Sequence, residues 1–424
     1  MLKLAGLAGN LAGVYMIIEQ GGLNMAKEVV IVDAVRTPFG RYNGLLKSVR
    51  PDDLGAIVIK ALLNRNPEVK PVEIEEVILG NANQAGEDNR NVARMSALLA
   101  GLPVEVGGST VNRLCGSGLD AVNYAARAIL AGEGEVFIAG GTESMTRAPF
   151  VMAKPEIGYP RGNVELYDTT IGWRFTNERL RTMYGAESMP ETAENVAKEY
   201  EISREEQDRF ALESQLRAKA AIQNGHLKAE IVPVAYKDCK GNEYIVEMDE
   251  HPRPETTIEK LSQLKPIFPN GTITAGNASG VNDGASALLL MSSKKAEQLG
   301  LKPLAKYIVS AAAGVHPSVM GIGPVISTKK ALKRAGLTIK DINLIELNEA
   351  FAAQSIACMK LLQLNPDKVN VNGGAIAFGH PLGASGARIM TTLLYEMKRR
   401  KVQYGLATMC IGVGQGISTI VENV

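Results

Sequence analysis

A strand–helix–strand pattern occurs twice along the chain, and this repetition constrains the fold more than any other feature of the sequence. Short apolar runs bounded by polar or glycine residues are typical of buried strands, and apolar residues spaced three and four apart are typical of helices. In each part of the chain, one predicted strand precedes such a helix and another follows it. These elements cover residues 76–80, 119–129 and 135–141 in the first part, and residues 342–347, 384–397 and 405–409 in the second. The alternation predicts a layered α/β fold of two duplicated halves.

A long segment of different character separates the two halves. One helix in it has a clear start, because Ser203 and Glu206 form a capping box, and Gly225 is a suitable stop. After this segment the chain returns to the first half, where residues 285–291 are predicted as a helix or as a strand of its sheet. We therefore expect an inserted loop domain that covers the active face. The predicted boundaries are residues 25–150 with 270–300 for the N-terminal half, 151–269 for the insertion and 301–424 for the C-terminal half.

Residues 1–24 do not fit a targeting signal well. They are apolar and glycine-rich after Lys3, but no small-x-small cleavage site follows and no arginine is present. We expect a non-native or disordered extension, with the true start of translation at Met25.

The charge balance gives no indication of a nucleic-acid or membrane partner. The chain has 46 Lys and Arg against 45 Asp and Glu, a net charge of +1, and no block of like charge. The 4 cysteines and 4 histidines are scattered, without the spacing of a metal site or a disulfide framework. We predict a cytoplasmic protein with no bound metal, whose partners are small molecules and further copies of the same chain.

Cys115 lies in the turn between a strand-like run and the helix that starts near Leu119. Unpaired amides and the dipole at a helix N-terminus stabilise an anion, so this position predicts a reactive thiol with a lowered pKa. The neighbouring residues Gly116 and Gly118 would let a substrate approach the backbone closely. A buried structural cysteine beside a tight turn is the alternative.

Three segments of the second half favour the reactive interpretation. They contain Asn348, then His380, then Cys410 with Gly412 two residues later. Together they supply a polar group, a base and a second thiol, which is a set suited to covalent catalysis. Each of them has a structural alternative on its own, as a turn cap or a core residue. The repeat places His380 at the turn that corresponds to that of Cys115, so we expect the two turns to meet.

These segments resemble the signature blocks of the thiolase family, and the likeness extends over nearly the whole chain from Met25. The resemblance implies the thiolase fold, a layered αβαβα arrangement, and an acyltransferase activity. It also implies coenzyme A (CoA) as co-substrate, no permanently bound cofactor, and a homodimer or homotetramer. The matching blocks are residues 112–118, 348–352, 379–381 and 410–412.

The resemblance assigns a role to each of four catalytic residues. His380 deprotonates Cys115, which attacks the 3-keto carbon of a 3-oxoacyl-CoA, and Cys410 protonates the acetyl-CoA enolate that leaves. One oxyanion hole pairs the His380 side chain with a water held by Asn348. The other consists of the backbone amides of Cys115 and Gly412. The acyl group on Cys115 is then transferred to a second CoA.

Further residues match positions that the family uses to bind CoA and the acyl chain. Ser279 matches a serine that contacts pantetheine, and Arg253 is a candidate for the nucleotide end of CoA. Met189, Met320 and Phe351 are predicted to line the acyl pocket, with a role in the hydrophobic core as the alternative for the two methionines.

Three segments, residues 83–95, 168–175 and 189–195, resemble the branch of the family that acts on 3-oxoadipyl-CoA. Val413 supports this branch, because most thiolases have glycine there. The substrate of that branch ends in a carboxylate, which requires a cation in the pocket. Arg174 is our first candidate for this cation.

His316 and Arg90 are the next candidates for the cation. The branch implies cleavage of 3-oxoadipyl-CoA to succinyl-CoA and acetyl-CoA. Two alternatives stay open. One is a thiolase for acetoacetyl-CoA or for fatty 3-oxoacyl-CoA, and the other is a catalytically silent thiolase-fold protein that binds acyl-CoA or lipid.

Overall fold

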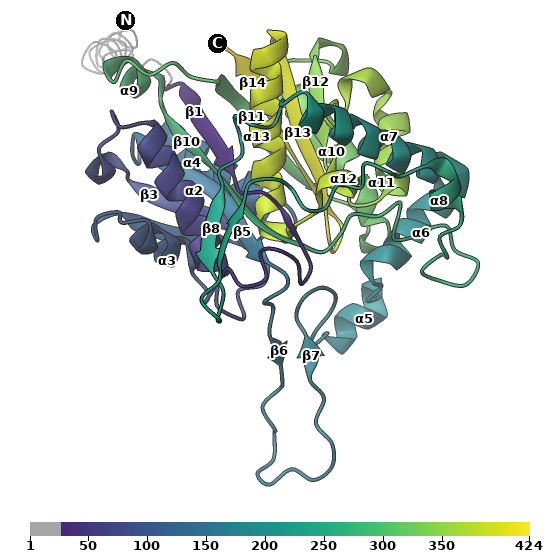
Figure 1. Ribbon diagram of the computed structural model, residues 1–424. Coiled ribbons are helices and arrows are strands. Elements are labelled where there is room, and N and C mark those ends of the chain that lie inside the picture. The colour runs from purple at the N-terminus through teal and green to yellow at the C-terminus, as the bar shows by residue number, and fades with distance from the viewer. Residues whose placement is uncertain (1–26) are drawn as a thin grey trace, which may run out of the picture.

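A ten-stranded sheet runs through the computed structural model, which describes residues 27–424 (Figure 1). The predicted extension at residues 1–24 and the predicted start at Met25 lie outside the described residues. In spatial order the strands are β12 (Leu344–Leu347), β13 (Tyr404–Ile411), β14 (Gln415–Asn423), β11 (Ala305–Gly314), β1 (Val29–Arg36), β10 (Asn282–Ser292), β5 (Val136–Ser144), β3 (Glu76–Gly80) and β4 (Gly107–Val111), with β2 (Gly40–Arg41) beside β10.

The sheet repeats one topology on either side of its centre. Going outward from the centre of the first half, β1 pairs antiparallel with β10, β10 antiparallel with β5, and β5 parallel with β3. In the second half, β11 likewise pairs antiparallel with β14, β14 antiparallel with β13, and β13 parallel with β12. The two halves join where β1 pairs with β11, antiparallel, with Val30 opposite Lys306. The repeat read from the sequence thus corresponds to two similar half-sheets. The residue boundaries proposed for the domains stay a prediction.

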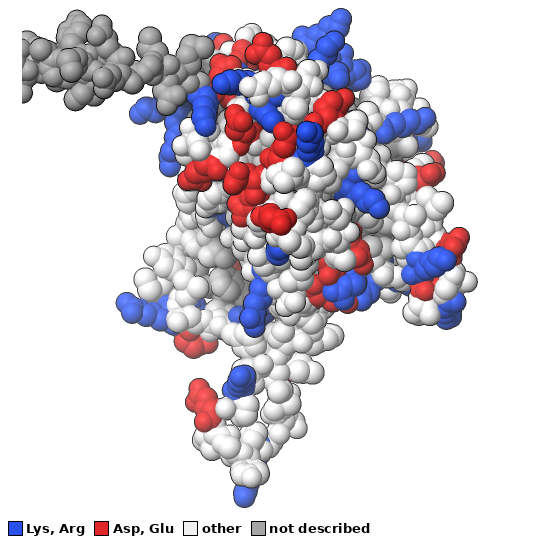
Figure 2. All heavy atoms as spheres, turned by 90° about the vertical axis from the view of Figure 1, so that its left-hand side faces the viewer, with Lys and Arg blue, Asp and Glu red and all other residues white. Residues whose placement is uncertain are grey.

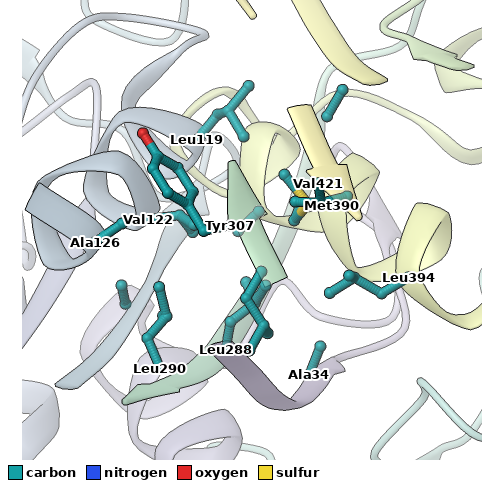
Figure 3. Packing of buried hydrophobic residues seen from close by; sticks show 14 of the residues in the cluster. Ala34, Leu119, Val122, Ala126, Leu288, Leu290, Tyr307, Met390, Leu394 and Val421 are labelled. Atoms are coloured by element: carbon teal, nitrogen blue, oxygen red, sulfur yellow. The ribbon is translucent and has the colours of Figure 1, made fainter. Parts of the chain in front are cut away.

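Two helices, α4 (Ser117–Ala131) and α13 (Leu382–Arg400), lie between the half-sheets. Their apolar side chains share one cluster with residues from both halves of the sheet. Figure 3 shows Leu119 and Val122 of α4 and Met390 and Leu394 of α13 in this cluster, together with Leu288 of β10. Because α4 and α13 are buried on nearly all sides, this cluster is the central core of the molecule.

Outer helices complete the layers. On the far side of the first half-sheet, α2 (Pro51–Arg65) and α3 (Val92–Leu99) bury a second apolar cluster. On the far side of the second, α10 (Gly323–Ala335) and α11 (Ala352–Leu362) bury a third. The order is therefore helix, sheet, helix, sheet, helix, which confirms the predicted αβαβα arrangement. There are also two short helices in these halves. The helix α9 (Ser293–Gln298) follows β10, and α12 (Ala375–Phe378) precedes α13.

The predicted insertion contains smaller elements outside these layers. A long hairpin built on β6 and β7 extends away from the body (Figure 1), and the helices α5 to α8 lie beside the second half. The predicted capping box at Ser203 is present, with Ser203 and Glu206 bonded to each other's backbone amides. The elements are β6 (Phe150–Val151), β7 (Tyr167–Asp168), α5 (Glu178–Tyr184), α6 (Met189–Glu199), α7 (Arg204–Gln223), β8 (Val234–Lys237), β9 (Glu243–Val246) and α8 (Ile258–Ser262).

Glycines allow α4 and α13 to touch backbone to backbone at their N-terminal ends. A Cβ on Gly118 would lie 2.5 Å from the carbonyl oxygen of Gly383, and one on Gly386 would lie 2.3 Å from the nitrogen of Leu119. A Cβ on Gly141 of β5 would lie 1.9 Å from the same Gly383 oxygen. No side chain fits between these segments, so the start of α13 is fixed directly against α4 and β5.

Gly386→Ala is expected to destabilise the protein by about 2 kcal/mol, even though alanine is the better helix former, because its methyl group would overlap the Leu119 backbone. The measurement is the urea midpoint by circular dichroism at fixed protein concentration. Gly314→Ala is the matched control, since the nearest atom to its Cβ would be 3.7 Å away. Equal midpoints for the two variants would contradict the close-packing argument.

Candidate active site

The turn that carries Cys115 is held by side chains on both sides of it. Asn112 accepts a hydrogen bond from the Leu114 amide at 2.9 Å, and its own amide group donates to the Ala82 carbonyl at 3.0 Å. Ser117 donates to the Leu114 carbonyl at 2.5 Å. Leu114 has a φ of 47°, a left-handed conformation that is costly for a non-glycine residue. This bent turn presents the Cys115 thiol just ahead of α4, as predicted.

Backbone amides surround the Cys115 thiol. The backbone amides of Gly412 and of Cys115 itself act to lower the pKa of the thiol. Burial nevertheless raises this pKa to about 11, against the effect of the amides. The prediction of a lowered pKa is therefore wrong, because loss of solvation outweighs the helix N-terminus. At neutral pH Cys115 is a thiol and requires a base to become a nucleophile.

His380 has the properties of that base. Burial, and then the nearby charge of Arg388, lower its pKa to about 3, so the imidazole is neutral at physiological pH. Its Nδ1 lies 2.6 Å from the hydroxyl of Ser385, which donates its proton to the Pro381 carbonyl at 2.8 Å. The hydroxyl can then only accept from Nδ1–H, which leaves Nε2 unprotonated. Nε2 is buried and has no hydrogen-bond partner within residues 27–424, so its lone pair is free to take a proton.

Asn348 follows β12 and is held by its backbone amide, which donates to the Thr408 carbonyl at 3.0 Å. Both polar atoms of its side chain are buried without a partner in the described part of the chain. Buried amide groups are nearly always bonded, to protein or to water. An unpartnered amide of this kind is suited to hold a water molecule or a substrate atom.

Cys410 lies on β13, two residues before Gly412. Cys410 is 2 % exposed. This burial, together with the nearby Cys115 when that thiol is ionised, raises the pKa of the Cys410 thiol well above the usual value. It packs in an apolar cluster that contains Met189, Met320 and Phe351. The second thiol is therefore near the first and is protonated at rest.

A cavity of about 320 Å³ opens above Cys115. Its lining includes Met189, Arg174 and Val413 as well as Cys115 itself. Leu382, two residues after His380, also lines it, so segments of both halves meet at the cavity as the repeat predicted. Arg174 is half-buried and donates to the Asn83 carbonyl at 3.3 Å.

Other predicted binding residues do not line this cavity. Met320 and Phe351 are 2 % and 7 % exposed and belong to the cluster behind it, around Cys410. His316 caps a short 3₁₀ helix, where its Nδ1 lies 2.7 Å from the Ser318 hydroxyl, and Arg90 is an exposed loop residue.

The two residues predicted to bind CoA lie in separate segments. The amide of Ser279 donates to the Ala350 carbonyl at 2.9 Å, which joins its loop to the segment after Asn348. Arg253 is exposed, and its amide donates to Gln215 of α7 at 2.8 Å. Neither residue belongs to the cavity lining, so their proposed contacts with CoA stay a prediction.

Two further polar residues belong to the site and were not predicted from the sequence. Ser385, which orients His380, lies five residues after it on α13 and had no distinctive pattern around it. Glu143, a buried carboxylate at the end of β5, lines the cavity. Glu143 could have been noticed in the sequence, because it is a charged residue at the end of a largely apolar predicted strand, shortly after the glycine pair at 140–141.

Comparison with known proteins agrees with this fold and site. Residues 29–294 match the family "Thiolase, N-terminal domain", and residues 301–423 match "Thiolase, C-terminal domain". The chain belongs to the thiolase family, and it is an acyltransferase, as the sequence blocks predicted.

Individual relatives are similar over almost their whole length. The chain is 58% identical to the 3-oxoadipyl-CoA/3-oxo-5,6-dehydrosuberyl-CoA thiolase of Escherichia coli (strain K12), over 94% of this chain and 100% of that one. A crystal structure of the Bacillus anthracis acetyl-CoA acetyltransferase has a TM-score of 0.89 at 42% identity, covering 95% of this chain and 100% of that one. Human mitochondrial 3-ketoacyl-CoA thiolase, in a crystal structure with CoA, has a TM-score of 0.87 at 42% identity, covering 94% and 99%.

Within residues 27–424, none of the helices combines the length and the apolar character that crossing a membrane requires.

Val413, beside Gly412 in the hairpin between β13 and β14, has a φ of 62°. A β-branched side chain is strained in this left-handed conformation. We expect Val413→Gly to raise stability by about 1 kcal/mol, the relief of strain less the entropy cost of glycine, measured by urea unfolding. Lys401→Gly is the control, since Lys401 has a φ of 54° but an unbranched side chain. A Val413→Gly protein no more stable than the wild type would show that the turn stores no strain.

Proposed function

We propose that this protein catalyses the CoA-dependent cleavage of a 3-oxoacyl-CoA, with 3-oxoadipyl-CoA as its preferred substrate and succinyl-CoA and acetyl-CoA as products. The observation that carries the proposal is the cavity above Cys115, whose lining includes the partly buried thiol of Cys115, the backbone of Gly412 and the half-buried guanidinium of Arg174. The 58% identity to the Escherichia coli thiolase for 3-oxoadipyl-CoA supports the choice of substrate.

In the first half-reaction, Nε2 of His380 takes the proton of the Cys115 thiol as the sulfur attacks the 3-keto carbon. The bond between C2 and C3 then breaks, which leaves an acyl group on Cys115 and the enolate of acetyl-CoA. Cys410 donates its proton to the enolate carbon. The buried Cys410 thiol suits this step, because its raised pKa keeps the proton in place until a strong base forms.

Before the second half-reaction, the proton on His380 passes to the Cys410 thiolate, which restores the neutral imidazole and the Cys410 thiol. The thiol of a new CoA then gives its proton to Nε2 of His380, and its sulfur attacks the acyl carbon on Cys115. The bond to the Cys115 sulfur breaks, the acyl group stays on CoA, and His380 passes the proton to Cys115, so that the site returns to its starting state. Since the enzyme holds the acyl group between the two steps, ping-pong kinetics are expected.

Two sets of donors fit the two oxyanions that form in these steps. The amides of Gly412 and Cys115, which act on the pKa of the resting thiol, are suited to bond an oxygen on the carbon attached to that sulfur. The unpartnered side chain of Asn348 is suited to hold a water for the other oxyanion, next to His380. This assignment gives Asn348 a role in catalysis in place of a purely structural one.

Arg174 provides the proposed selectivity for a terminal carboxylate. Its guanidinium makes one hydrogen bond, to a backbone carbonyl, and no ion pair within residues 27–424 includes it. The other N–H donors of this cavity-lining guanidinium have no protein partner among the described residues. A carboxylate can accept two of them at once, which a methyl-terminated acyl chain cannot.

We also propose a homo-oligomer, either a dimer or a tetramer, in a reducing compartment such as the cytoplasm. The hairpin of β6 and β7 carries exposed apolar side chains, among them Ile157 at 78% and Tyr159 at 100% exposure. On the face drawn in Figure 2 most of this hairpin is uncharged. A large apolar surface of this kind favours burial against another copy. All 4 cysteines are free, which supports the compartment.

Asn348→Ala is expected to slow turnover by about 10²–10³, the typical effect of losing one oxyanion donor, without changing the unfolding midpoint. The side chain makes no hydrogen bond within residues 27–424, so its removal leaves no protein group unpaired. Stopped-flow loss of the 3-oxoacyl-CoA enolate absorbance measures the rate. Turnover equal to that of the wild type would exclude Asn348 from the mechanism.

The substrate preference is tested by kcat/KM for thiolysis of 3-oxoadipyl-CoA and of acetoacetyl-CoA. We expect a preference of at least tenfold, about 1.4 kcal/mol, for the dicarboxylate substrate. Arg174→Ala should reduce activity on 3-oxoadipyl-CoA by about 10–100-fold, the range for a lost hydrogen bond to a charged group, and leave acetoacetyl-CoA nearly unaffected. Arg90→Ala, at an exposed position outside the cavity lining, is the control.

The outcomes separate the candidate functions. A preference for acetoacetyl-CoA would keep the mechanism and reject the substrate. Equal losses on both substrates would remove Arg174 from selectivity. Absence of thiolysis with any 3-oxoacyl-CoA, despite alkylation of Cys115 that acyl-CoA blocks, would favour the silent acyl-CoA-binding protein.

A further inference from the structure

Glu143 is a buried carboxylate that the reaction described above does not use. It lies near the end of β5, is 1 % exposed, and lines the same cavity as Cys115. No ion pair within residues 27–424 includes it. A buried acid without a cation is costly, so its presence at the reactive thiol requires an explanation.

Four N–H donors from two separate parts of the molecule converge on this carboxylate. Three of them come from the turn after β3, namely the Ala82 amide at 2.8 Å, the Asn83 amide at 3.2 Å and the Asn81 side chain at 3.2 Å. The fourth is the Gly383 amide, at 2.8 Å. Glu143 thereby joins the first half of the chain to the second.

Gly383 is the second residue of α13, three residues after His380. Its amide is one of the unpaired donors at the helix N-terminus, where an anion is favourable. The segment from His380 to Gly383 is short, and it is pressed against the neighbouring backbone. A Cβ on Gly383 would lie 2.7 Å from the Cα of Asn81. The bond from Gly383 to Glu143 thus sets the position of the His380 segment relative to the half that carries Cys115.

The charge of Glu143 also acts on the nucleophile. A nearby anion disfavours a thiolate, and Glu143 contributes to the raised pKa of Cys115. Burial raises the pKa of Glu143 itself to about 7, although the amides of Ala82, Gly383 and Asn83 favour the charged form. Above neutral pH the carboxylate is therefore ionised.

We propose that Glu143 is a positioning residue for the thiolase reaction, which holds the His380 segment in place for catalysis and whose negative charge, at the same cavity, adds to the effects that disfavour the Cys115 thiolate. The two effects act on different steps. The hydrogen bond to Gly383 favours turnover, because base and nucleophile must be aligned. The charge disfavours the thiolate and so slows the reaction of the resting Cys115 with electrophiles. The inference rests on the proposed roles of Cys115 and His380.

The variant Glu143→Gln separates this proposal from a merely structural role. The proposal predicts that the alkylation rate of Cys115 rises in this variant while the thiolysis rate falls. The charge is lost, and the NH2 group that replaces one carboxylate oxygen cannot accept from the two N–H donors there, while the side-chain shape is nearly the same. Alkylation of Cys115 by iodoacetamide at about pH 8.5 should become about threefold to tenfold faster, since more thiolate is present. Thiolysis kcat at the same pH should fall by about 10², with KM for CoA little changed. Peptide mapping confirms that Cys115 is the residue alkylated.

Two further variants serve as controls. Glu143→Asp keeps the charge but is too short to reach Gly383, so thiolysis should fall while alkylation stays at the wild-type rate. It carries the test if Glu143→Gln does not fold, as judged by circular dichroism. Asp283→Asn removes another buried carboxylate, which bonds Ser144 and Thr146 but not α13, and should change neither rate.

Alkylation of Glu143→Gln that is equal to or slower than that of the wild type would overturn the proposal, and so would unchanged thiolysis. Alkylation of Glu143→Asp faster than that of the wild type would overturn the role of the charge. Failure of the proposed function is seen separately, as absence of thiolysis in the wild-type protein. The alkylation comparison still reports on Glu143 and Cys115 in that case.

Discussion

The backbone contact between α4 and α13 is the constraint on which the rest of the structure depends. Gly118 and Gly386 let the two helices approach more closely than any side chain would allow. Each helix starts at a turn that carries a proposed catalytic residue, Cys115 before α4 and His380 before α13. Since the helices are buried between two half-sheets, neither can shift without opening the central core. The rigid core thus determines where the two turns meet.

Exclusion of water gives the site its chemical character. Burial moves the pKa of His380 down to about 3 and that of Cys115 up to about 11, so both groups are neutral at rest. Charges then form only during the reaction, next to amide donors already in place. Preorganised donors in a dry site stabilise such charges more strongly than water-exposed ones. Glu143 differs from these two groups, because above neutral pH it is an anion, and backbone amides stabilise its charge.

Local patterns predicted the elements well and the contacts between them less well. The strand Glu76–Gly80 was predicted at its observed bounds, because it is a continuous apolar run between turn residues. Residues 285–291 were ambiguous, since an apolar run of that length fits either element, and they lie in β10. The four sequence blocks identified Cys115 and its family. The burial that raises the pKa of Cys115 and the amides that bond Glu143 come from segments distant in the chain, which no local pattern encodes.

The order of the strands has a consequence for the synthesis of the protein. β14 lies between β11 and β13 in the sheet, although it follows both in the chain. A nascent chain that has not yet released β14 exposes two unpaired strand edges, and before α13 emerges it also exposes the apolar face of α4. Such surfaces promote association with other incomplete chains. We therefore expect folding of this enzyme during synthesis to benefit from chaperones that shield these edges and the face of α4 until the last strand is available.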